Sequence, residues 1–461
     1  MNGCGSMEKK RRNGIVPFFY TTIPTDVRSI MEREMNLHKN NFLKFMVLWA
    51  GELISSIGGG LTSFGLGVYV FQQSGSAAST SMVMLLAFLP TLLLSVPAGV
   101  LADRHDRRVL MMIGDGFSAF GILYVLACMI QGEADLYQIC IGVFISSAFS
   151  ALLEPAYRAT VTDLLTKEEY SKASGMVSIA GSARFFISPI LAGTLLAVSD
   201  IKLLLAIDIC TFFLTVIGAA MVKREIGEGR ATPMTDCRGE GYPEKGERES
   251  FGESLKQGWK AIAGRHGILA LVTVSALITY FMGTFQTLAQ PLILDFADSA
   301  ALGIGETICA CGMLASGLFL GIRGIKRGYV KKLSVSLFGA GIGMAGFGIR
   351  ENFFSICLFG ILFFAMLPFA NNCLDYLVRT NIPDELQGRA WGVIGFISQI
   401  GYVVAYGTAG VAADRVAVWF RLSIGRGAAW VIITAGGLLC MTALLLYALK
   451  SVRGLERNSD D

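Results

Sequence analysis

Long apolar runs separated by short polar segments make up the chain from about residue 42 onward. Each run holds about 20 residues, the length that a helix needs to cross a hydrocarbon layer of about 30 Å. Lipid satisfies no backbone hydrogen bonds, so each run must form a helix, and none alternates as a barrel strand does. We count twelve runs, at approximately 42–71, 78–101, 109–130, 136–160, 173–198, 202–222, 267–295, 300–322, 331–349, 353–377, 388–413 and 428–449. The predicted fold class is an all-α membrane protein with twelve transmembrane helices.

Composition supports this prediction. Of the 461 residues, 53% are hydrophobic and 16% are charged, whereas soluble domains carry roughly 25% charged residues. The mean hydropathy is +0.57. These values argue against an ordinary soluble enzyme, and we predict no enzymatic activity.

Basic residues indicate how the helices are oriented, because Lys and Arg are retained on the cytoplasmic side of multispanning proteins. If the N-terminus is cytoplasmic, 33 of the 39 Lys and Arg residues fall in cytoplasmic tails and loops. We therefore expect a multi-pass protein of the cell membrane with both termini in the cytoplasm. The net charge of +4 then follows from topology, so no nucleic-acid partner is predicted.

One long polar interruption divides the twelve runs into six and six. Its apolar residues Phe251, Leu255, Trp259 and Ile262 have helical spacing, which fits a short helix on the membrane surface or a solvated linker equally well. Met31 and Met35 offer alternative starts to an irregular N-terminal tail. The expected parts are an N-terminal tail (1–41), a first half (42–222), a linker (223–266), a second half (267–449) and a C-terminal tail (450–461).

Cysteine and histidine positions indicate no metal site. Most of the ten cysteines lie in apolar spans, where a thiol packs as a small hydrophobic group, and the three histidines lie in polar segments. We predict no disulfide framework, no metal and no cofactor. No Gly-rich phosphate loop is present, and the linker is too short for an ATPase domain, so an ion gradient or a partner subunit must supply energy.

The two halves share a sparse internal repeat. A shift of 217 positions pairs Glu168 with Glu385 and Gly175 with Gly392, in the loop between the fourth and fifth spans of each half. Duplicated six-span halves are typical of transporters in which the substrate binds between the halves.

The loop after the second span carries a recognisable motif: Gly99, then Asp103 and Arg104, then Arg107 and Arg108. It resembles the signature loop of the major facilitator superfamily, although Asp106 replaces an inner glycine. The equivalent loop of the second half, 321–327, keeps bases without an acid. Two further segments, Trp49-Ala50-Gly51 and Glu154-Pro155-Ala156-Tyr157-Arg158, resemble the macrolide-efflux branch of that superfamily.

The resemblance implies two six-helix halves, a monomer in the lipid bilayer, and a gating role for the signature loop. Gly99, Arg104 and Arg108 belong to that loop, in which we take Asp103 and Arg107 as the residues of a cytoplasmic latch. Their expected acidic partners are Asp115, Glu154 and Asp375. The alternative is that the arginines only fix topology.

Ionisable residues within the spans are functional candidates, because burying them in lipid is costly. Glu52 and Arg184 have matching depths in the first and fifth spans, so we expect an ion pair, either purely structural or with Glu52 coupling transport to protons or cations. Asp208 and Glu306 lie nearer the outer face and are weaker candidates.

Aromatic and amide side chains in the second half offer walls for a large, mostly apolar ligand. The expected group comprises Tyr280, Phe281, Phe285, Gln286, Gln290, Gln399, Tyr402 and Tyr406. In the fifth span, Ser188-Pro189-Ile190-Leu191-Ala192-Gly193 resembles a loosened form of an element found in the superfamily's antiporters, which favours export.

The favoured hypothesis is a secondary exporter of lipophilic, macrolide-like or other drugs, driven by proton antiport with alternating access. The second hypothesis is a transporter of a siderophore, lipid or metabolite. A third, from a different class, is a membrane sensor that keeps the transporter fold without transport.

Overall fold

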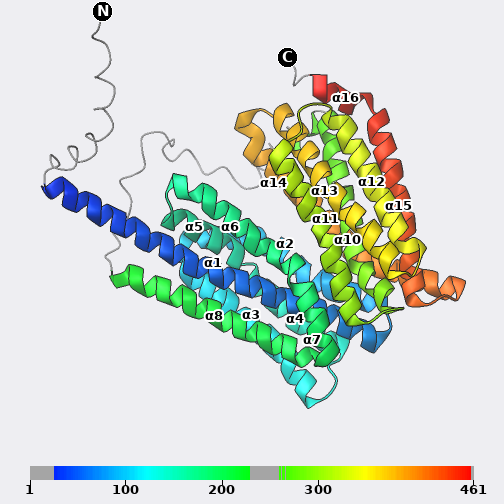
Figure 1. Ribbon diagram of the computed structural model, residues 1–461, viewed down its shortest axis with the longest axis horizontal. Helices are drawn as coiled ribbons and strands as arrows, with labels where there is room; N and C mark the ends of the chain where they lie inside the picture. The colour runs from blue at the N-terminus through cyan, green and yellow to red at the C-terminus, as the bar shows by residue number, and fades with distance from the viewer. Residues whose placement is uncertain (1–24, 229–258, 261, 265, 458–461) are drawn as a thin grey trace, which may run out of the picture.

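A computed structural model describes residues 25–228, 259–260, 262–264 and 266–457. These residues are helical throughout apart from short connections, and twelve helical segments are long and apolar enough to cross a membrane. The prediction of an all-α protein with twelve spans is thereby confirmed. The helices form two bundles, which Figure 1 shows side by side.

The N-terminal bundle contains the first six spans, two of which are each divided into two helices. Its elements are α1 (Thr25–Ser74), α2 (Ala77–Arg104), α3 (Arg107–Gln131), α4 (Leu136–Ser150), α5 (Leu153–Leu164), α6 (Lys167–Phe186), α7 (Ser188–Val198) and α8 (Ile201–Glu228).

The C-terminal bundle contains the other six spans and one short terminal helix. Its elements are α10 (His266–Leu294), α11 (Ser299–Arg323), α12 (Tyr329–Ile349), α13 (Phe353–Asn381), α14 (Asp384–Phe420), α15 (Ile424–Ala448) and α16 (Lys450–Arg457).

Prolines explain both divisions in the N-terminal bundle. A proline inside a helix removes one backbone hydrogen bond and clashes with the carbonyl four residues earlier. The expected span 136–160 breaks at Ala151 and Leu152, just before Pro155, and the expected span 173–198 breaks at Ile187, just before Pro189. The spans were therefore placed correctly along the chain, but the sequence analysis treated each as one continuous helix.

The first helix and the linker between the halves need separate comment. Helix α1 begins at Thr25, so residues 25–41 extend the first helix and are not the irregular tail that we expected. Most of the segment 251–262, for which a surface helix and a solvated linker were equally expected, and most of the linker 223–266 lie outside the described residues.

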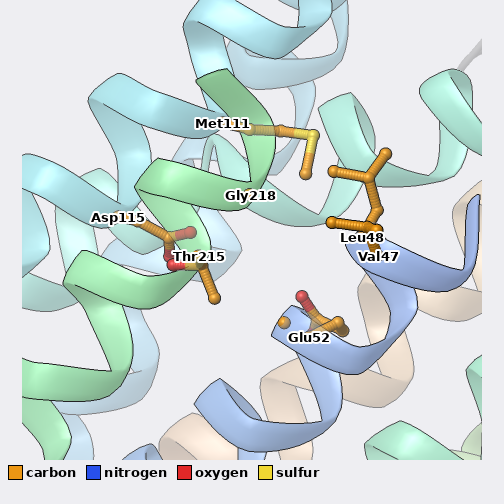
Figure 2. Close-up of a pocket in the computed structure, with 8 residues that line it drawn as sticks. Val47, Leu48, Glu52, Met111, Asp115, Thr215 and Gly218 are labelled. Carbon is orange, nitrogen blue, oxygen red and sulfur yellow. The ribbon is translucent and has the colours of Figure 1, made fainter. Parts of the chain in front are cut away.

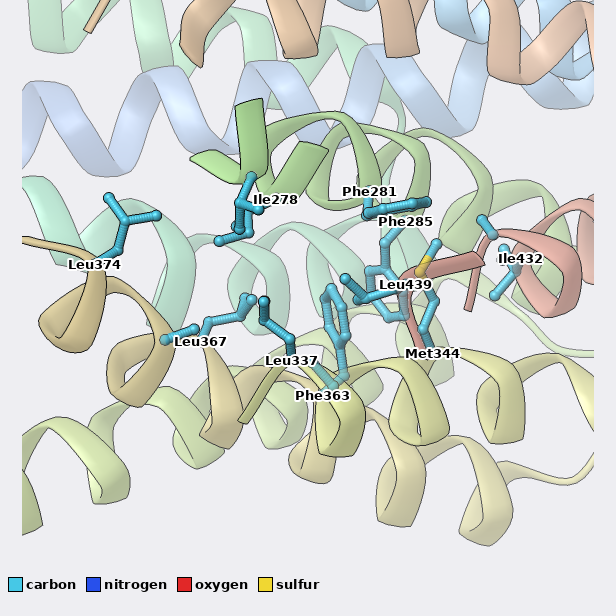
Figure 3. Close-up of a cluster of buried hydrophobic side chains, with 14 of the residues drawn as sticks. Ile278, Phe281, Phe285, Leu337, Met344, Phe363, Leu367, Leu374, Ile432 and Leu439 are labelled. Atoms are coloured by element: carbon cyan, nitrogen blue, oxygen red, sulfur yellow. The ribbon is translucent and has the colours of Figure 1, made fainter. Parts of the chain in front are cut away.

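The core of the C-terminal bundle contains two aromatics that we had assigned to a ligand cavity. Phe281 and Phe285 are each 3% exposed and pack inward from α10 (Figure 3). The Phe285 ring stacks on Phe363 with centroids 4.5 Å apart and contacts Phe347 at 4.6 Å. The prediction that these two phenylalanines line a cavity is wrong. The sequence of an apolar helix face does not distinguish a face that packs in a core from one that binds a ligand.

The two bundles meet closely at one end, which we call the closed end. There α2 packs on α14, and α7 packs on α11. Glycines permit both contacts: a side chain at Gly303 would collide with the carbonyl of Pro189, and one at Gly410 would collide with Ala77 and Ser81.

The bundles diverge toward the opposite end, which we call the open end and which carries the C-terminus (Figure 1). The halves of these helices that lie toward the open end carry exposed apolar side chains, among them Leu93 and Val100 on α2, Phe396 on α14, and Leu318 and Ile322 on α11. The structure is thus closed at one end of the bundles and parted at the other.

The short helix α16 is fastened to the C-terminal bundle at the open end. Val452 and Leu455 are buried, and the amide of Asn381 donates to the Leu455 carbonyl at 3.2 Å. The Glu456 carboxylate accepts a hydrogen bond from the backbone N–H of Tyr329 at 2.8 Å, at the start of α12. The chain thereby folds back onto α10, α12 and α13.

Candidate functional site between the bundles

Three aromatic rings meet at the boundary between the two bundles. Phe88 of α2 contacts Tyr402 and Tyr406 of α14, with ring centroids 5.5 and 5.8 Å apart. The Tyr406 hydroxyl donates to the Gln286 side chain of α10 at 2.9 Å. We call these four residues the aromatic group. It combines apolar walls with a polar anchor, which suits a large apolar ligand.

Tyr402, Tyr406 and Gln286 are wall residues that the sequence predicts, whereas Phe88 is not. One phenylalanine in an apolar span carries no signal that separates it from lipid-facing ones, so only the contact reveals its place. Of the other expected wall residues, Tyr280 is half-buried on α10 and Gln399 is exposed on α14.

Arg184 lies beside α1, but it does not pair with Glu52. Its guanidinium donates to the Ser63 hydroxyl at 2.7 Å and stays exposed. The expected ion pair is therefore wrong. Ser63 lies eleven positions beyond Glu52, about 16 Å along a helix at 1.5 Å per residue. We expected the pair because Glu52 and Arg184 lie equally far along their spans. The structure shows that equal position along two spans does not mean equal height, because α1 and α6 begin at different levels.

Arg184 is instead within electrostatic range of Asp208 and Tyr406. Asp208, on α8, is 1% exposed and accepts a hydrogen bond from Thr62 at 2.6 Å. Because Thr62 and Ser63 are neighbours on α1, a short stretch of that helix connects the buried acid to the exposed base.

Glu52, drawn in Figure 2, begins a polar stripe along α1. Its carboxylate lies near the Ser56 side chain, one turn later, and Ser63 lies on the same face two turns beyond Ser56. All three residues keep some solvent-accessible surface, whereas their neighbours Ser55 and Thr62 are buried. The stripe leads from Glu52 to Arg184.

Glu306 occupies a similar position in the C-terminal bundle. It is half-buried on α11, and its carboxylate lies near the side-chain amide of Gln290 on α10. Gln290 is 5% exposed, and its Oε1 atom lies against Gly67 of α1 and has no hydrogen-bond partner. Gln290 thus lies between Glu306 and the point where α10 contacts α1 of the other bundle.

The signature loop forms its ion pair with a residue that we did not predict. Arg107 contacts Asp163 of α5 at 2.6 Å and donates to the Ala159 carbonyl at 3.1 Å. The expected partners Asp115, Glu154 and Asp375 are wrong for this conformation, because the start of α3 lies beside the end of α5. Both ion-paired residues belong to the N-terminal bundle, so this contact does not join the halves.

The remaining loop and acid residues are placed as follows. Asp103 and Arg104 are exposed, and Gly99 has open space around it. Glu154 pairs with Arg158 of its own helix at 2.9 Å. Asp106, which replaces the inner glycine of the motif, caps α3 by accepting from the Arg108 backbone N–H at 3.0 Å. A helix cap thus accounts for the departure from the motif.

A hydrogen-bonded contact joins the bundles at the closed end. Asp414 of α14 accepts hydrogen bonds from the Ser76 hydroxyl at 2.6 Å and from the backbone N–H groups of Ala77 and Ala78 at 2.9 and 3.1 Å. Sequence reasoning missed it. The available signal was an acid near the outer end of one span and an N-cap serine at the start of another.

Within the part of the chain that the structure describes, no group of three His, Cys, Asp or Glu side chains is arranged to hold a metal ion. The functional groups between the bundles are therefore aromatic rings, amides, hydroxyls and isolated charges. Such a set is chemically suited to binding a solute.

The Major Facilitator Superfamily family model matches residues 48–406. The chain belongs to this superfamily. Macrolide efflux protein A of Streptococcus pyogenes is 26% identical over 402 residues, which cover 84% of this chain and 94% of that protein. An uncharacterized transporter of the same superfamily from Bacillus subtilis, YfiS, is 26% identical over 426 residues, covering 89% of this chain and 94% of that protein. The chain is a multi-pass membrane transporter and not an enzyme.

Other similarities are more limited. The staphyloferrin A transporter of Staphylococcus aureus is 29% identical over 161 residues, covering 34% of this chain and 38% of that protein. A bacterial homologue of the lysosomal transporter Spinster, in an inward-facing conformation, is 12% identical with a TM-score of 0.64, covering 91% of this chain and 98% of that one. A bacterial homologue of ferroportin, also inward-facing, is 14% identical with a TM-score of 0.62, covering 88% and 99%. These structures share the fold.

Proposed function

We propose that the protein exports lipophilic drugs of the macrolide type, in exchange for protons, by alternating access. The observation that carries this proposal is the similarity to macrolide efflux protein A over almost the full length of that protein. The site agrees, since the aromatic group presents apolar surface beside one hydroxyl and one amide.

The arrangement of the bundles supports alternating access. They are joined at the closed end by Asp414 and by glycine contacts, and they diverge at the open end. A solute can enter from one side only in this state. With both termini in the cytoplasm, as the basic residues favour, the open end faces the cytoplasm, and a drug enters from there.

Glu52 and Glu306 are the proposed proton carriers. Each is a membrane-embedded carboxylate for which the described residues include no basic group in contact, and such carboxylates mark proton pathways in transporters. The proposed assembly is a monomer in the bilayer with no cofactor.

The decisive experiment is accumulation of a radiolabelled macrolide in inverted membrane vesicles driven by an imposed pH gradient. We expect accumulation that a protonophore abolishes and that is lost in Glu52→Gln, which should still exchange drug at equilibrium. Glu133→Gln, in an exposed loop, is the matched control and should transport like the wild type. Unchanged transport by Glu52→Gln at every pH would remove Glu52 from coupling, and no accumulation by the wild type would reject macrolide export.

A second candidate function is transport of an anionic metabolite such as a siderophore. The exposed guanidinium of Arg184 favours it, since arginine pairs well with carboxylates, as does the partial similarity to the staphyloferrin A transporter. A panel with one cationic macrolide and one polycarboxylate distinguishes the two functions. If neither moves under any gradient, a sensor without transport becomes the better explanation.

A further inference from the structure

The end of α14 extends beyond the closed end. This helix has 37 residues, about 55 Å at 1.5 Å per residue, whereas a bilayer with its headgroup layers is about 40–45 Å thick. Figure 1 shows its orange end, beside the start of α15, projecting past the neighbouring helices. The last turns of α14 therefore lie outside the hydrocarbon layer.

Asp414 fixes the level of this segment in the membrane. It caps the start of α2, so it lies at the height where that span begins. Arg415 follows directly, and Arg421 lies about 9 Å farther along the helix. Each headgroup layer is about 5–8 Å thick, which is half the difference between the whole bilayer and its hydrocarbon core. Residues 415–421 thus cross the headgroup layer at the closed end.

Arg415 stands on the side of α14 that faces lipid. Val404, Val411 and Val418 are exposed and follow one another at intervals of seven residues, which places them on one face, and the opposite face is buried. Arg415 lies on the exposed face, between Val411 and Val418. Trp419 is one turn beyond Arg415 and is 79% exposed, and tryptophan is enriched at membrane–water interfaces. The apolar face of the span thus continues into the headgroup layer beside a base.

Basic residues are scarce on this side of the protein but gather at this point. In the expected topology six Lys and Arg residues lie outside the cytoplasmic tails and loops, and three of them fall within 415–426. Arg415 and Arg421 are both exposed, and neither side chain has an ion pair or hydrogen bond with another described residue. Short loops on this side of a membrane normally carry few bases, so the pair indicates a use for their charge.

The acids at this end of the C-terminal bundle are engaged elsewhere. Asp414 caps α2, and Asp298 caps α11. Asp295 accepts from the N-cap hydroxyl of α15 at 2.5 Å, and Glu351 lies 3.6 Å from the guanidinium of Arg426. These described acids therefore leave the two exposed arginines at the end of α14 without a counter-charge.

The backbone at Arg421 supports a use for its side chain. Arg421 ends α14 in the left-handed conformation, with φ 50° and ψ 45°, and it is the one non-glycine residue with positive φ in the described part of the chain. Glycine normally takes this place, because a Cβ is strained there. An arginine kept at an unfavourable position indicates a function for the guanidinium.

We propose that Arg415 and Arg421 bind the phosphate of one anionic phospholipid, of the phosphatidylglycerol type, in the leaflet at the closed end. Guanidinium groups form paired, charge-assisted hydrogen bonds to phosphate. The exposed Val418 and Trp419 meet the glycerol backbone and the upper acyl chains, which a free anion does not have. The occupant is therefore a lipid and not inorganic phosphate.

A lipid bound here acts on the contact between the bundles. Arg415 follows Asp414, whose hydrogen bonds to α2 hold the closed end together. Tyr406 of the aromatic group lies about two turns earlier on the same helix. A lipid that holds this turn of α14 favours the closed end, because a ligand that binds one conformation better raises its population. The effect on transport rests on the proposed function, whereas lipid binding does not.

Native mass spectrometry of the full chain in detergent tests the binding site. With equal amounts of phosphatidylglycerol and phosphatidylcholine, we expect the wild type to retain one phosphatidylglycerol in preference. Arg415→Gln combined with Arg421→Gln should weaken this preference about tenfold. The matched control, Lys202→Gln combined with Arg350→Gln, removes two exposed bases on the same side of the membrane and should behave like the wild type. Equal preference in the wild type and the Arg415/Arg421 variant would overturn the proposal.

Glycerol 3-phosphate distinguishes a lipid site from a site for a soluble anion, because it carries the headgroup charge without acyl chains. A large excess should leave the bound phosphatidylglycerol in place, and Trp419→Ala should weaken its retention. Displacement of the lipid by glycerol 3-phosphate would overturn the assignment to a lipid.

Arg421→Gly keeps the test valid if the double variant folds poorly. Glycine suits the left-handed conformation, so in uncharged detergent this variant should unfold at the same temperature as the wild type or at a higher one. It should lack the rise in unfolding temperature that phosphatidylglycerol gives the wild type. A rise equal to that of the wild type would contradict lipid binding by Arg421.

Spin labels at Gln131 and Arg350, which are exposed on the two bundles at the closed end, measure the effect on conformation. In vesicles of phosphatidylglycerol the wild type should show a larger population at short distance than in phosphatidylcholine, and the Arg415/Arg421 variant should show no difference. Equal populations of the wild type in both lipids would show that the lipid does not act on the closed end. No drug is present in these experiments, so a failure of macrolide transport leaves their results unaffected.

Discussion

Asp414 of α14 caps the N-terminus of α2 across the boundary between the two bundles. It accepts three hydrogen bonds, one from the Ser76 hydroxyl and two from backbone N–H groups. A helix N-terminus carries a partial positive charge that favours an acid. The contact therefore holds the closed end together in this conformation and must break before that end opens.

We expect Asp414→Asn to favour opening of the closed end. The amide is neutral and offers one acceptor oxygen in place of two, so the cap weakens by about 1 kcal/mol. Spin labels at Gln131 and Arg350, exposed residues at this end of the two bundles, should show a larger population at long distance. Native cysteines are replaced beforehand.

Asp298→Asn is the matched control for this measurement. Asp298 caps α11 within the C-terminal bundle, accepting from the Ala301 backbone N–H at 2.8 Å. Its loss should lower stability by a similar amount without separating the labels. Equal distance distributions for both variants would show that Asp414 does not hold the bundles together.

Gly303→Ala should destabilise the closed end by steric collision. The new methyl group would collide with the Pro189 carbonyl, and overpacking of this kind costs about 1–3 kcal/mol. On the same helix, Gly317 has nothing within 4 Å, so Gly317→Ala should be neutral or stabilise α11 by up to about 1 kcal/mol. Thermal unfolding in detergent compares the two, and a Gly303→Ala variant as stable as the wild type would contradict the close contact.

The ion pair between Arg107 and Asp163 should show measurable coupling. The two side chains are 30% and 47% exposed, so we expect about 0.5–1 kcal/mol in a double-mutant cycle of Arg107→Ala and Asp163→Asn. Arg158 and Glu154 are 69% and 72% exposed, so a double-mutant cycle on this pair should give a smaller coupling free energy. Strictly additive effects at Arg107 and Asp163 would mean that the arginine acts through its other contacts.

Tyr406→Phe should change drug affinity more than Tyr402→Phe. Both substitutions keep a ring next to Phe88, but only the Tyr406 hydroxyl bonds to Gln286. Its removal leaves a partly buried amide without its donor, and we expect about a fivefold rise in KM for a drug held there. Equal KM values for the two variants would place the drug elsewhere.

Hydropathy alone predicted the twelve spans, because the need to close backbone hydrogen bonds in lipid leaves few alternatives. It also placed Asp208 and Glu306 in spans, where burial follows directly from the surrounding residues. The break at Ile187 also has a local signal in the sequence, because Pro189 has no N–H to donate to the helix.

Contacts between helices could not be predicted in the same way. Pairing Arg184 with Ser63 and not Glu52 depends on the relative register of α1 and α6, which no local pattern encodes. The assignment of Arg107 to Asp163 depends likewise on where α5 ends. Both errors concern which turn of one helix faces which turn of another, a property of packing and not of composition.

The seating of α16 has a practical consequence for handling the protein. Leu455 and Glu456 hold the ends of α12 and α13, so a truncation before Lys450 would leave the Tyr329 N–H and the Asn381 amide without these acceptors. An affinity tag is better placed beyond Arg457 on a flexible spacer, where it leaves this anchoring undisturbed.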